Sequence, residues 1–191
     1  RRHIRRTEKK GISLEVIDST TEENALKDFF KGFQEAHFTS AGKSTRPPQT
    51  WNTMKEMIKR DKAILFVAKI KNTIISYLLC GKFRNMSWGW SQVNIEKYEK
   101  EYSPRHFLEW QSILYLKNEG FDFYEIGDIS YHPSPFYIPS KKELSISMFK
   151  ERYGACLLPK VYWTYFFDEE LGLKISKQKT SNFLNNFYAG D

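Results

Sequence analysis

The chain has 191 residues, a formal net charge of +7 and 40% hydrophobic residues, and aromatic side chains make up 16% of it. This length suits one domain with a substantial core, and the composition excludes an intrinsically disordered chain. No apolar run reaches the ~20 residues of a membrane-spanning helix, since the best candidate, residues 63–68, has the length of a strand. The positive charge favours acidic partners such as RNA, nucleotide-linked precursors or anionic lipid headgroups.

The first eleven residues are strongly basic, and we interpret residues 1–11 as a linker segment whose arginines bind polyanions in a salt-dependent way. No apolar stretch follows the arginines and no initiating Met is present, so we expect a chain that begins inside a longer protein without a secretory signal. Cys80 and Cys156 cannot build a disulfide framework, and no Cys/His cluster has zinc-ligand spacing. We expect no metal and a cytoplasmic location, with the membrane surface as an alternative.

The first third of the chain changes from a strand-like to a helix-like period. Residues 12–17 predict a strand, and Thr21 is placed to cap the following helix. The apolar positions of that helix recur at helical spacing and are Ala25, Leu26, Phe29, Phe30 and Phe33. Residues 37–48 are rich in Ser, Thr, Gly and Pro and predict a loop, and residues 51–59 predict a second helix.

Three strands are predicted next. Residues 63–70 and 74–81 form apolar runs that are separated by a tight turn at Lys71-Asn72, which indicates a hairpin. Residues 86–93 predict a third strand. In it, Trp88 and Trp90 alternate with small residues, so we expect both indoles on one face of the sheet. We interpret them as core residues, with a wall of a substrate channel as the alternative.

The second half of the chain carries the most specific pattern. It begins with a predicted helix over 106–119 and a strand over 121–126 that stops at Gly127-Asp128. A loop follows, and then the motif Phe149-Lys150-x-x-Tyr153-Gly154. An aromatic strand over 161–167 and a short closing helix over 183–187 complete the chain. From about Phe29 to Asp168, this order and this motif resemble the FemAB-like branch of the GNAT acyltransferases. The resemblance is most specific at Phe149-Lys150 and Tyr153-Gly154.

The resemblance implies an α/β fold over residues 12–168, with a GNAT-like mixed, largely antiparallel sheet flanked by helices. Residues 169–191 would be an extension that packs on this domain. The family holds its acyl donor where two central strands splay apart, and it often has two such lobes in tandem. We find no Arg/Gln-x-x-Gly-x-Gly/Ala turn of the acetyl-CoA enzymes, which favours an aminoacyl-tRNA donor over acyl-CoA without settling the choice.

The implied activity is an acyl or aminoacyl transfer that forms an amide on an amino group of a cell-envelope, sugar-nucleotide or peptide precursor. Lys150 matches the family's lysine, and a cation aimed at a developing oxyanion is worth several kcal/mol. The equal alternative is that Lys150 belongs to a solvated loop face with Lys141, Lys142 and Arg152. Phe149 is placed to exclude water beside it. Asp128 is a candidate acceptor for the proton of the amine, with a turn-capping role as the more conservative interpretation.

Five further residues are candidates for substrate binding: Arg46, His106, Trp88, Trp90 and Tyr153. Arg46 follows the letters Gly-Lys-Ser, but the first glycine and the preceding strand of a P-loop are missing, so we interpret residues 41–46 as an anion-contacting loop. His106 lies at a predicted helix start, where anions are favoured, although we prefer to interpret it as an ordinary polar residue near the cap.

Two alternatives to an active transferase stay open. The first is a catalytically lapsed GNAT-like half that completes a larger enzyme. The second is a basic RNA-binding module, because positive charge with many aromatic residues also suits single-stranded nucleic acid. The lack of RNP-type motifs counts against the second alternative.

Overall fold

The computed structural model describes residue 7 and residues 9–130, 137–158 and 165–188, which fall into two compact units, Arg1–Ile126 and Gly127–Asp191. The arginines that we expect to bind polyanions, and residues 161–164 of the predicted aromatic strand, lie outside the described residues. In the part of the chain that is described, no helix is both long enough and apolar enough to cross a membrane.

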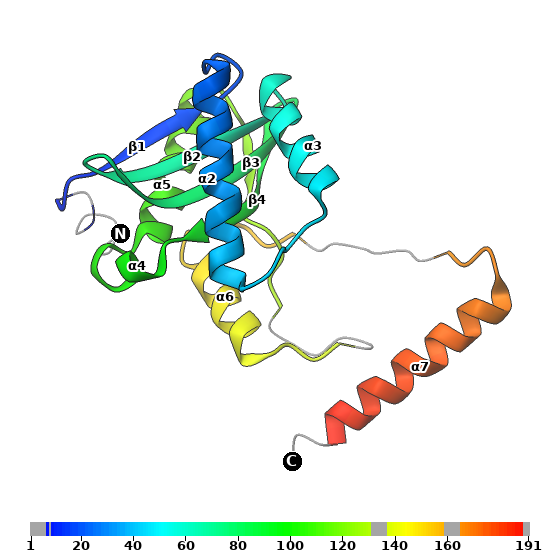
Figure 1. The fold of residues 1–191 in the computed structure, drawn as a ribbon. Coiled ribbons are helices and arrows are strands. Elements are labelled where there is room, and N and C mark those ends of the chain that lie inside the picture. The colour runs from blue at the N-terminus through cyan, green and yellow to red at the C-terminus, as the bar shows by residue number, and fades with distance from the viewer. Residues whose placement is uncertain (1–6, 8, 131–136, 159–164, 189–191) are drawn as a thin grey trace. The chain divides into compact units, whose positions relative to one another are not determined.

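The first unit contains all the strands that the structure describes (Figure 1). Its elements are β1 (Ile12–Ile17), α2 (Glu23–Ala41), α3 (Pro48–Lys59), β2 (Ala63–Ile70), β3 (Thr73–Phe83), β4 (Met86–Asn94), α4 (Glu96–Tyr102), α5 (Pro104–Asn118) and β5 (Phe123–Glu125). The predicted strands over 12–17, 63–70, 74–81 and 86–93 are confirmed, and α5 confirms the helix predicted over 106–119. The strand predicted over 121–126 is shorter than expected, and α4 was not predicted.

The five strands lie in the sheet in their sequence order, β1-β2-β3-β4-β5. The first three pairings are antiparallel and the last, between β4 and β5, is parallel, which confirms the predicted mixed and largely antiparallel sheet. The tight turn between β2 and β3 is also confirmed, with Lys71 in the left-handed region at φ 53°. Parallel pairing of β5 needs a crossover, and α4 and α5 supply it.

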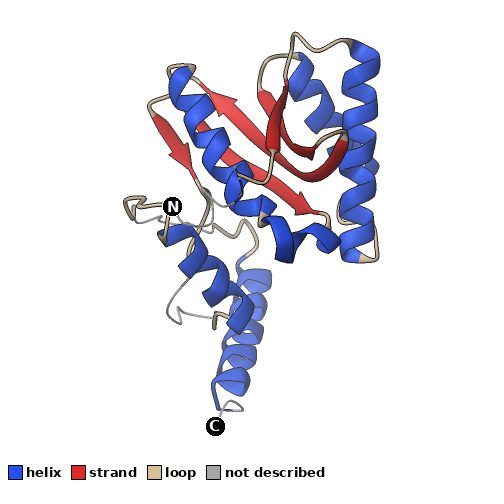
Figure 2. Cartoon of the chain, turned by 90° about the vertical axis from the view of Figure 1, so that its left-hand side faces the viewer, coloured by secondary structure: helices blue, strands red, loops and turns tan. Residues whose placement is uncertain are grey.

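Strand alternation places two separate cores on the two faces of the sheet. Helices lie against both faces (Figure 2). On one face, Leu65 and Leu79 pack with Phe33 of α2 and with residues of α3. On the other face, Phe66 packs in the same cluster as Leu108 of α5. The apolar face predicted for the first helix is confirmed, because Leu26, Phe30 and Phe33 are all buried. Both faces of the central strands are therefore covered, which explains their nearly continuous apolar sequences.

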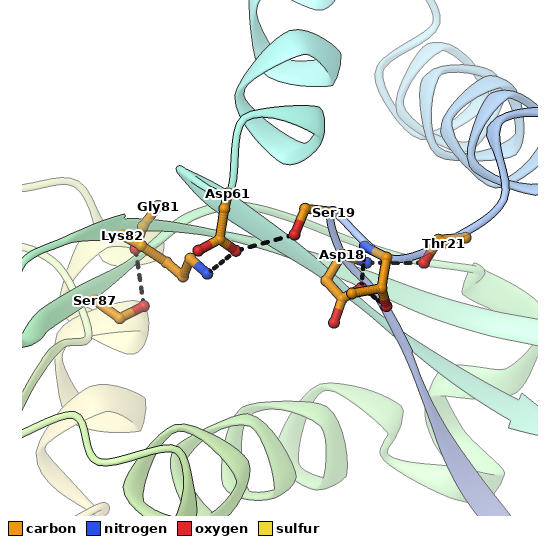
Figure 3. Close-up of polar contacts among 8 residues, drawn as sticks. Asp18, Ser19, Thr21, Asp61, Gly81, Lys82 and Ser87 are labelled. Atoms are coloured by element: carbon orange, nitrogen blue, oxygen red, sulfur yellow. Dashed lines mark hydrogen bonds and ion pairs between the residues drawn. The ribbon is translucent and has the colours of Figure 1, made fainter.

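Two predictions about the first helix are wrong. Its N-cap is Glu22, whose carboxylate accepts the backbone N–H of Ala25 at 3.0 Å. The hydroxyl of Thr21, which we expected to act as the cap, instead accepts the backbone N–H of Asp18 at 3.0 Å (Figure 3). The helix also continues to Ala41 and ends on Gly42 at φ 66°, so His37 lies on α2 rather than in the predicted loop.

A second set of contacts in Figure 3 joins two turns of the first unit, at Ser19 and at Asp61, to β3. Lys82 donates to Asp61, which also accepts the hydroxyl of Ser19 at 3.3 Å. On the neighbouring strand, Ser87 donates to the carbonyl of Gly81 at 2.9 Å. These contacts fix the end of β3 next to the start of β4, which is where the pairing with β5 begins.

β4 contains a bulge that interrupts the regular alternation we predicted. Its register with β3 passes from Ser91–Leu79 to Gly89–Cys80, so Trp90 has no opposite residue in this ladder. Trp88 is partly buried and its ring lies over Gly81, where a side chain would collide with it. Trp90 is 36% exposed, so our interpretation of Trp90 as a core residue is wrong.

In the second unit, the described helices are α6 (Lys141–Glu151) and α7 (Glu169–Tyr188). Phe149 and Lys150 therefore lie in the last turn of a helix and not in the predicted loop. Ser140 and Glu143 start α6 with a complete capping box. The short closing helix predicted over 183–187 is the end of the much longer α7. Residues 165–167, the described part of the predicted aromatic strand, form no strand, and the Phe167 side chain is 97% exposed.

Candidate functional site

The sheet opens between β4 and β5. The parallel pairing covers only three residue pairs and ends at Trp88 opposite Glu125, whereas β4 continues to Asn94. The bulge at Trp90 lies two residues beyond this end. Bulges increase the local twist and bend a strand, and this bulge lies where the pairing with β5 has already ended. The edge of β4 from Gly89 onward therefore presents backbone polar groups that β5 does not pair.

A buried hydrogen-bond chain lies where the two strands part. The hydroxyl of Tyr124 on β5 donates to a carboxylate oxygen of Glu109 at 2.7 Å and lies 3.8 Å from the sulfur of Cys80. A side chain at Gly89 would place its Cβ 2.9 Å from the Tyr124 hydroxyl oxygen, so the glycine allows the tyrosine to cross β4 at this point. Burial raises the pKa of Tyr124 well above its ordinary value, which keeps the hydroxyl protonated as a donor.

Gln92, further along the free part of β4, carries a polar atom without a partner. Its side-chain nitrogen Nε2 is buried and makes no hydrogen bond among the described residues. Gln92 pairs with Leu78, which belongs to the core on the α5 face. A buried amide without an acceptor is costly, and such groups in native proteins call for a specific explanation such as a ligand or an ion.

The other face of β4 carries a cluster that we name the Arg46 cluster, formed by His37, Arg46, Trp51 and Ser91. Arg46 donates from one terminal nitrogen to the Ser91 hydroxyl at 3.0 Å and from the other to the Thr45 hydroxyl at 3.2 Å. Its guanidinium lies 5.0 Å from the ring centroid of Trp51, within cation–π range. Ser91 also lies 3.0 Å from Nε2 of His37. The cluster joins α2, the loop after it, α3 and β4.

Electrostatics assign the donors and acceptors in this cluster. Burial, followed by the positive charge of Arg46, lowers the pKa of His37 to about 4, so the imidazole is neutral at pH 7. Burial also lowers the pKa of Arg46 from its ordinary value. Because Arg46 can only donate to Ser91, we assign the Ser91 proton to His37 Nε2. Two of the five N–H donors of Arg46 then have partners among the described residues.

An open pocket of about 220 Å³ lies beside this cluster. It is lined by Gln34, Glu35, Phe38, Ser44, Thr45 and Trp51. Trp51 belongs to both features, and Thr45 of the pocket lining accepts a hydrogen bond from Arg46. The lining combines a carboxylate, an amide, two hydroxyls and two aromatic rings, which are groups that bind hydroxylated amines well.

Lys150 is held by the main chain within the second unit. Its ammonium donates to the backbone carbonyl of Asp128 at 2.7 Å. The rings of Phe149 and Tyr153, one helical turn apart, pack edge to face with centroids 5.3 Å apart. The structure thus brings together all four candidate residues of this unit, Asp128, Phe149, Lys150 and Tyr153, as two contacting pairs. The contact between Lys150 and Asp128 is made through the main chain of Asp128.

His106 lies in the first turn of α5, as predicted. Its backbone N–H is already used by the carbonyl of Ser103 at 3.1 Å. This amide is therefore occupied, which weakens the case for an anion site at this helix start.

Among the residues of the candidate sites that were not predicted are His37, Ser91 and Glu109. His37 follows Phe33 by four residues, so the helical period already extended to it, but the nearby Ser, Thr, Gly and Pro residues suggested a loop. Ser91 was treated only as a small residue between tryptophans. Glu109 is 4% exposed, and nothing in the sequence around it indicates that a charged residue would be buried there.

No family model and no curated protein sequence matches this chain. Among solved structures, FemX superposes with a TM-score of 0.61 at 14% identity, over 81% of this chain and 53% of FemX. An aminoglycoside acetyltransferase from an uncultured soil metagenomic sample, solved with sisomicin, gives 0.58 at 10% identity, over 83% of this chain and 97% of its own. An aminoglycoside N-acetyltransferase solved with CoA superposes with a TM-score of 0.55 at 9% identity, over 82% of this chain and 95% of its own. The chain therefore has the fold of the GNAT acyltransferases, which FemX shares.

Proposed function

We propose that this protein is an N-acyltransferase or aminoacyltransferase that forms an amide on an amino group of a cell-envelope, sugar-nucleotide or peptide precursor. The observation that carries the proposal is the opening between β4 and β5, with its bulge at Trp90, in a GNAT-type sheet. An acyl donor with amide and carbonyl groups can pair with a free strand edge as an additional strand would.

The donor would lie along the free edge of β4. The side-chain nitrogen of Gln92, buried and without a partner among the described residues, offers a hydrogen bond to a carbonyl of the donor. An acyl-CoA and an aminoacyl-tRNA both carry such groups. One of the structurally similar acetyltransferases was solved with CoA, whereas the lack of the glycine-rich pyrophosphate turn in this sequence favours aminoacyl-tRNA.

The acceptor would occupy the pocket beside α2. Glu35 and the hydroxyls of Ser44 and Thr45 suit an amine with several hydroxyl groups, as in an amino sugar. Arg46 has N–H donors without partners in the described part of the chain, and these would receive a carboxylate or phosphate of the precursor. Trp88 and Trp90 would line the channel near the bulge.

The chemistry requires attack of the neutral amine on the acyl carbon, loss of the amine proton and departure of the thiolate or the tRNA hydroxyl. We assign Lys150 to the charge that develops on the acyl oxygen. Asp128 would accept the amine proton, and the protonated carboxyl would return it to the leaving group. Phe149 and Tyr153 would limit the access of water to the reacting carbon.

A catalytically lapsed half of a larger enzyme is the second candidate. It is favoured by the comparison with FemX, since this chain spans only about half the length of that protein. An incomplete protein of this kind would retain the fold and lack turnover.

The test is a transfer assay with the full-length protein. Acetyl-CoA, a panel of longer acyl-CoAs, and tRNA charged with alanine, serine or glycine are each offered with amino sugars, sugar nucleotides and short peptides. Mass spectrometry is used to detect the amide product. We expect amide formation with at least one pair of donor and acceptor, and loss of this product with Lys150→Ala. No product from any pair, with a folded protein, would contradict the transferase proposal and leave the lapsed half.

A further inference from the structure

The helix face that carries Lys150 also holds residues 127–130. Ser147 lies three residues before Lys150, so both side chains project from the same face of α6. Ser147 is 2% exposed. Its hydroxyl accepts the backbone N–H of Ser130 at 2.8 Å and donates to the carbonyl of the same residue at 3.2 Å. One side chain thus satisfies both main-chain polar groups of a residue that lies in no helix or strand.

Lys150 makes the second attachment of this segment, through the carbonyl of Asp128. The two attachments are two residues apart on the segment and three residues apart on the helix. A segment held at two such points cannot slide along α6 without breaking one of them. The position of the Lys150 ammonium therefore depends on the attachment at Ser147.

Gly127 makes room for the ammonium. Its backbone has φ 94°, a conformation that side chains rarely allow, and an added Cβ would lie 3.0 Å from Nζ of Lys150. Any larger residue at this position would strain the turn and push the ammonium away from the Asp128 carbonyl.

We propose that Ser147 and Gly127 are positioning residues for Lys150: Ser147 fixes residues 127–130 along α6, and Gly127 leaves the space that the ammonium occupies. The proposal rests on the proposed function only in treating Lys150 as the catalytic cation. Its function is to hold the cation in one place before substrate binds, so that little reorganisation is needed during the reaction.

A local readout tests the positioning without any substrate. Only a neutral amine reacts with an N-hydroxysuccinimide acetate, and an ammonium donating to a carbonyl must first give up that contact. The rate of modification of Lys150, measured by peptide mass spectrometry, is divided by the rates of Lys141 and Lys142 on the same helix. We expect Ser147→Ala to raise this ratio about three- to tenfold, the equivalent of one lost hydrogen bond. Ser145→Ala, an exposed serine of α6, should leave it unchanged.

Gly127→Ala provides an independent variant if Ser147→Ala fails to fold. Its matched control is Gly120→Ala, because Gly120 also has a positive φ, of 84°, but has no atom within 4 Å of the added Cβ. Gly127→Ala should raise the labelling ratio of Lys150, whereas Gly120→Ala should not. With an active pair of donor and acceptor, Ser147→Ala should lower kcat about tenfold with KM unchanged, and Gly127→Ala should lower it about 10- to 100-fold.

The outcomes separate this proposal from the proposed function. Full activity of Lys150→Ala would remove the catalytic role of Lys150, while the labelling ratios would still report whether Ser147 and Gly127 hold its ammonium. An unchanged Lys150 labelling ratio in both Ser147→Ala and Gly127→Ala, in folded proteins, would overturn the positioning proposal even if the enzyme were active.

Discussion

The two candidate cations of this protein are held in different ways. Arg46 is partly buried and is fixed by side chains from three other positions, Thr45, Trp51 and Ser91, with a neutral histidine behind the serine. Lys150 lies at the end of a helix and is fixed by a main-chain carbonyl. Side-chain partners can be changed one at a time, and the histidine behind them can titrate, whereas a main-chain carbonyl can do neither. The Arg46 cluster should therefore respond to pH and to single substitutions in ways that the Lys150 contact does not.

The largest effect is expected at Lys150. Lys150→Ala should lower kcat by about two to three orders of magnitude, the usual loss when one oxyanion donor is removed, while the melting temperature changes little. Lys150→Arg should restore only part of the activity, because a planar guanidinium cannot replace a compact ammonium. Lys142→Ala, at the start of the same helix, controls for the loss of charge. Wild-type turnover in a folded Lys150→Ala protein would assign catalysis elsewhere.

Arg46 should affect substrate binding more than turnover. Arg46→Gln should raise the KM of an acceptor carrying a carboxylate or phosphate about 10- to 100-fold, the worth of one charge-assisted hydrogen bond, with a smaller change in kcat. Lys43→Gln removes the same charge from the same loop without touching the cluster. Equal KM increases in both variants would show that only the general charge of the loop matters.

Ser91 should contribute mainly to stability. Ser91→Ala removes the hydroxyl that hydrogen-bonds both the Arg46 guanidinium and the His37 ring. The free energy of unfolding, measured by urea titration, should therefore fall by about 1–3 kcal/mol. Ser13→Ala, an exposed serine on β1, should cost less than about 0.5 kcal/mol. A loss at Ser91 no greater than at Ser13 would mean that the cluster adds no net stability.

The smallest effect is a pH dependence of the free energy of unfolding that arises in the Arg46 cluster. The pKa of His37 is lowered from 6.5 to about 4 on folding, so below pH 6.5 the unfolded chain binds a proton that the folded chain does not. This part of the stability is present above pH 6.5 and is lost as the pH falls towards 4, by ~1–2 kcal/mol for a half-exposed ring. His37→Asn should flatten this part of the curve relative to the wild type. Identical slopes for the two proteins would contradict the neutral assignment of His37.

The order of elements from β1 to β4 was predictable because the central strands are buried on both faces and the first two helices have clear apolar sides. The bulge at Trp90 was not predictable, because nothing in the alternation of tryptophans with small residues shows that one residue will be skipped. α6 was missed because Ser147 is its only buried residue, so it has almost no apolar period. Its start was nevertheless encoded, since Ser140 and Glu143 have the spacing of a capping box.

The candidate sites were predictable only in part. Arg46 was identified from its loop, and Lys150 from a motif, but their partners come from distant positions. Ser91 is 45 residues from Arg46, and Asp128 reaches Lys150 through its backbone, which no side-chain pattern reveals. The buried Glu109 accepts a hydrogen bond from Tyr124, a contact that no sequence pattern predicts.

The sequence order of the strands has a consequence for how the protein folds. β2, β3 and β4 are joined by two short turns, whereas β1 and β5 are each joined to their neighbour through a pair of helices. Short loops close at lower entropic cost, so we expect the three central strands to pair first and β1 and β5 to add later. In pulsed hydrogen exchange during refolding, amides of β2–β4 should gain protection before those of β5. The opening between β4 and β5 would then be completed late in folding, on a sheet that is already in place.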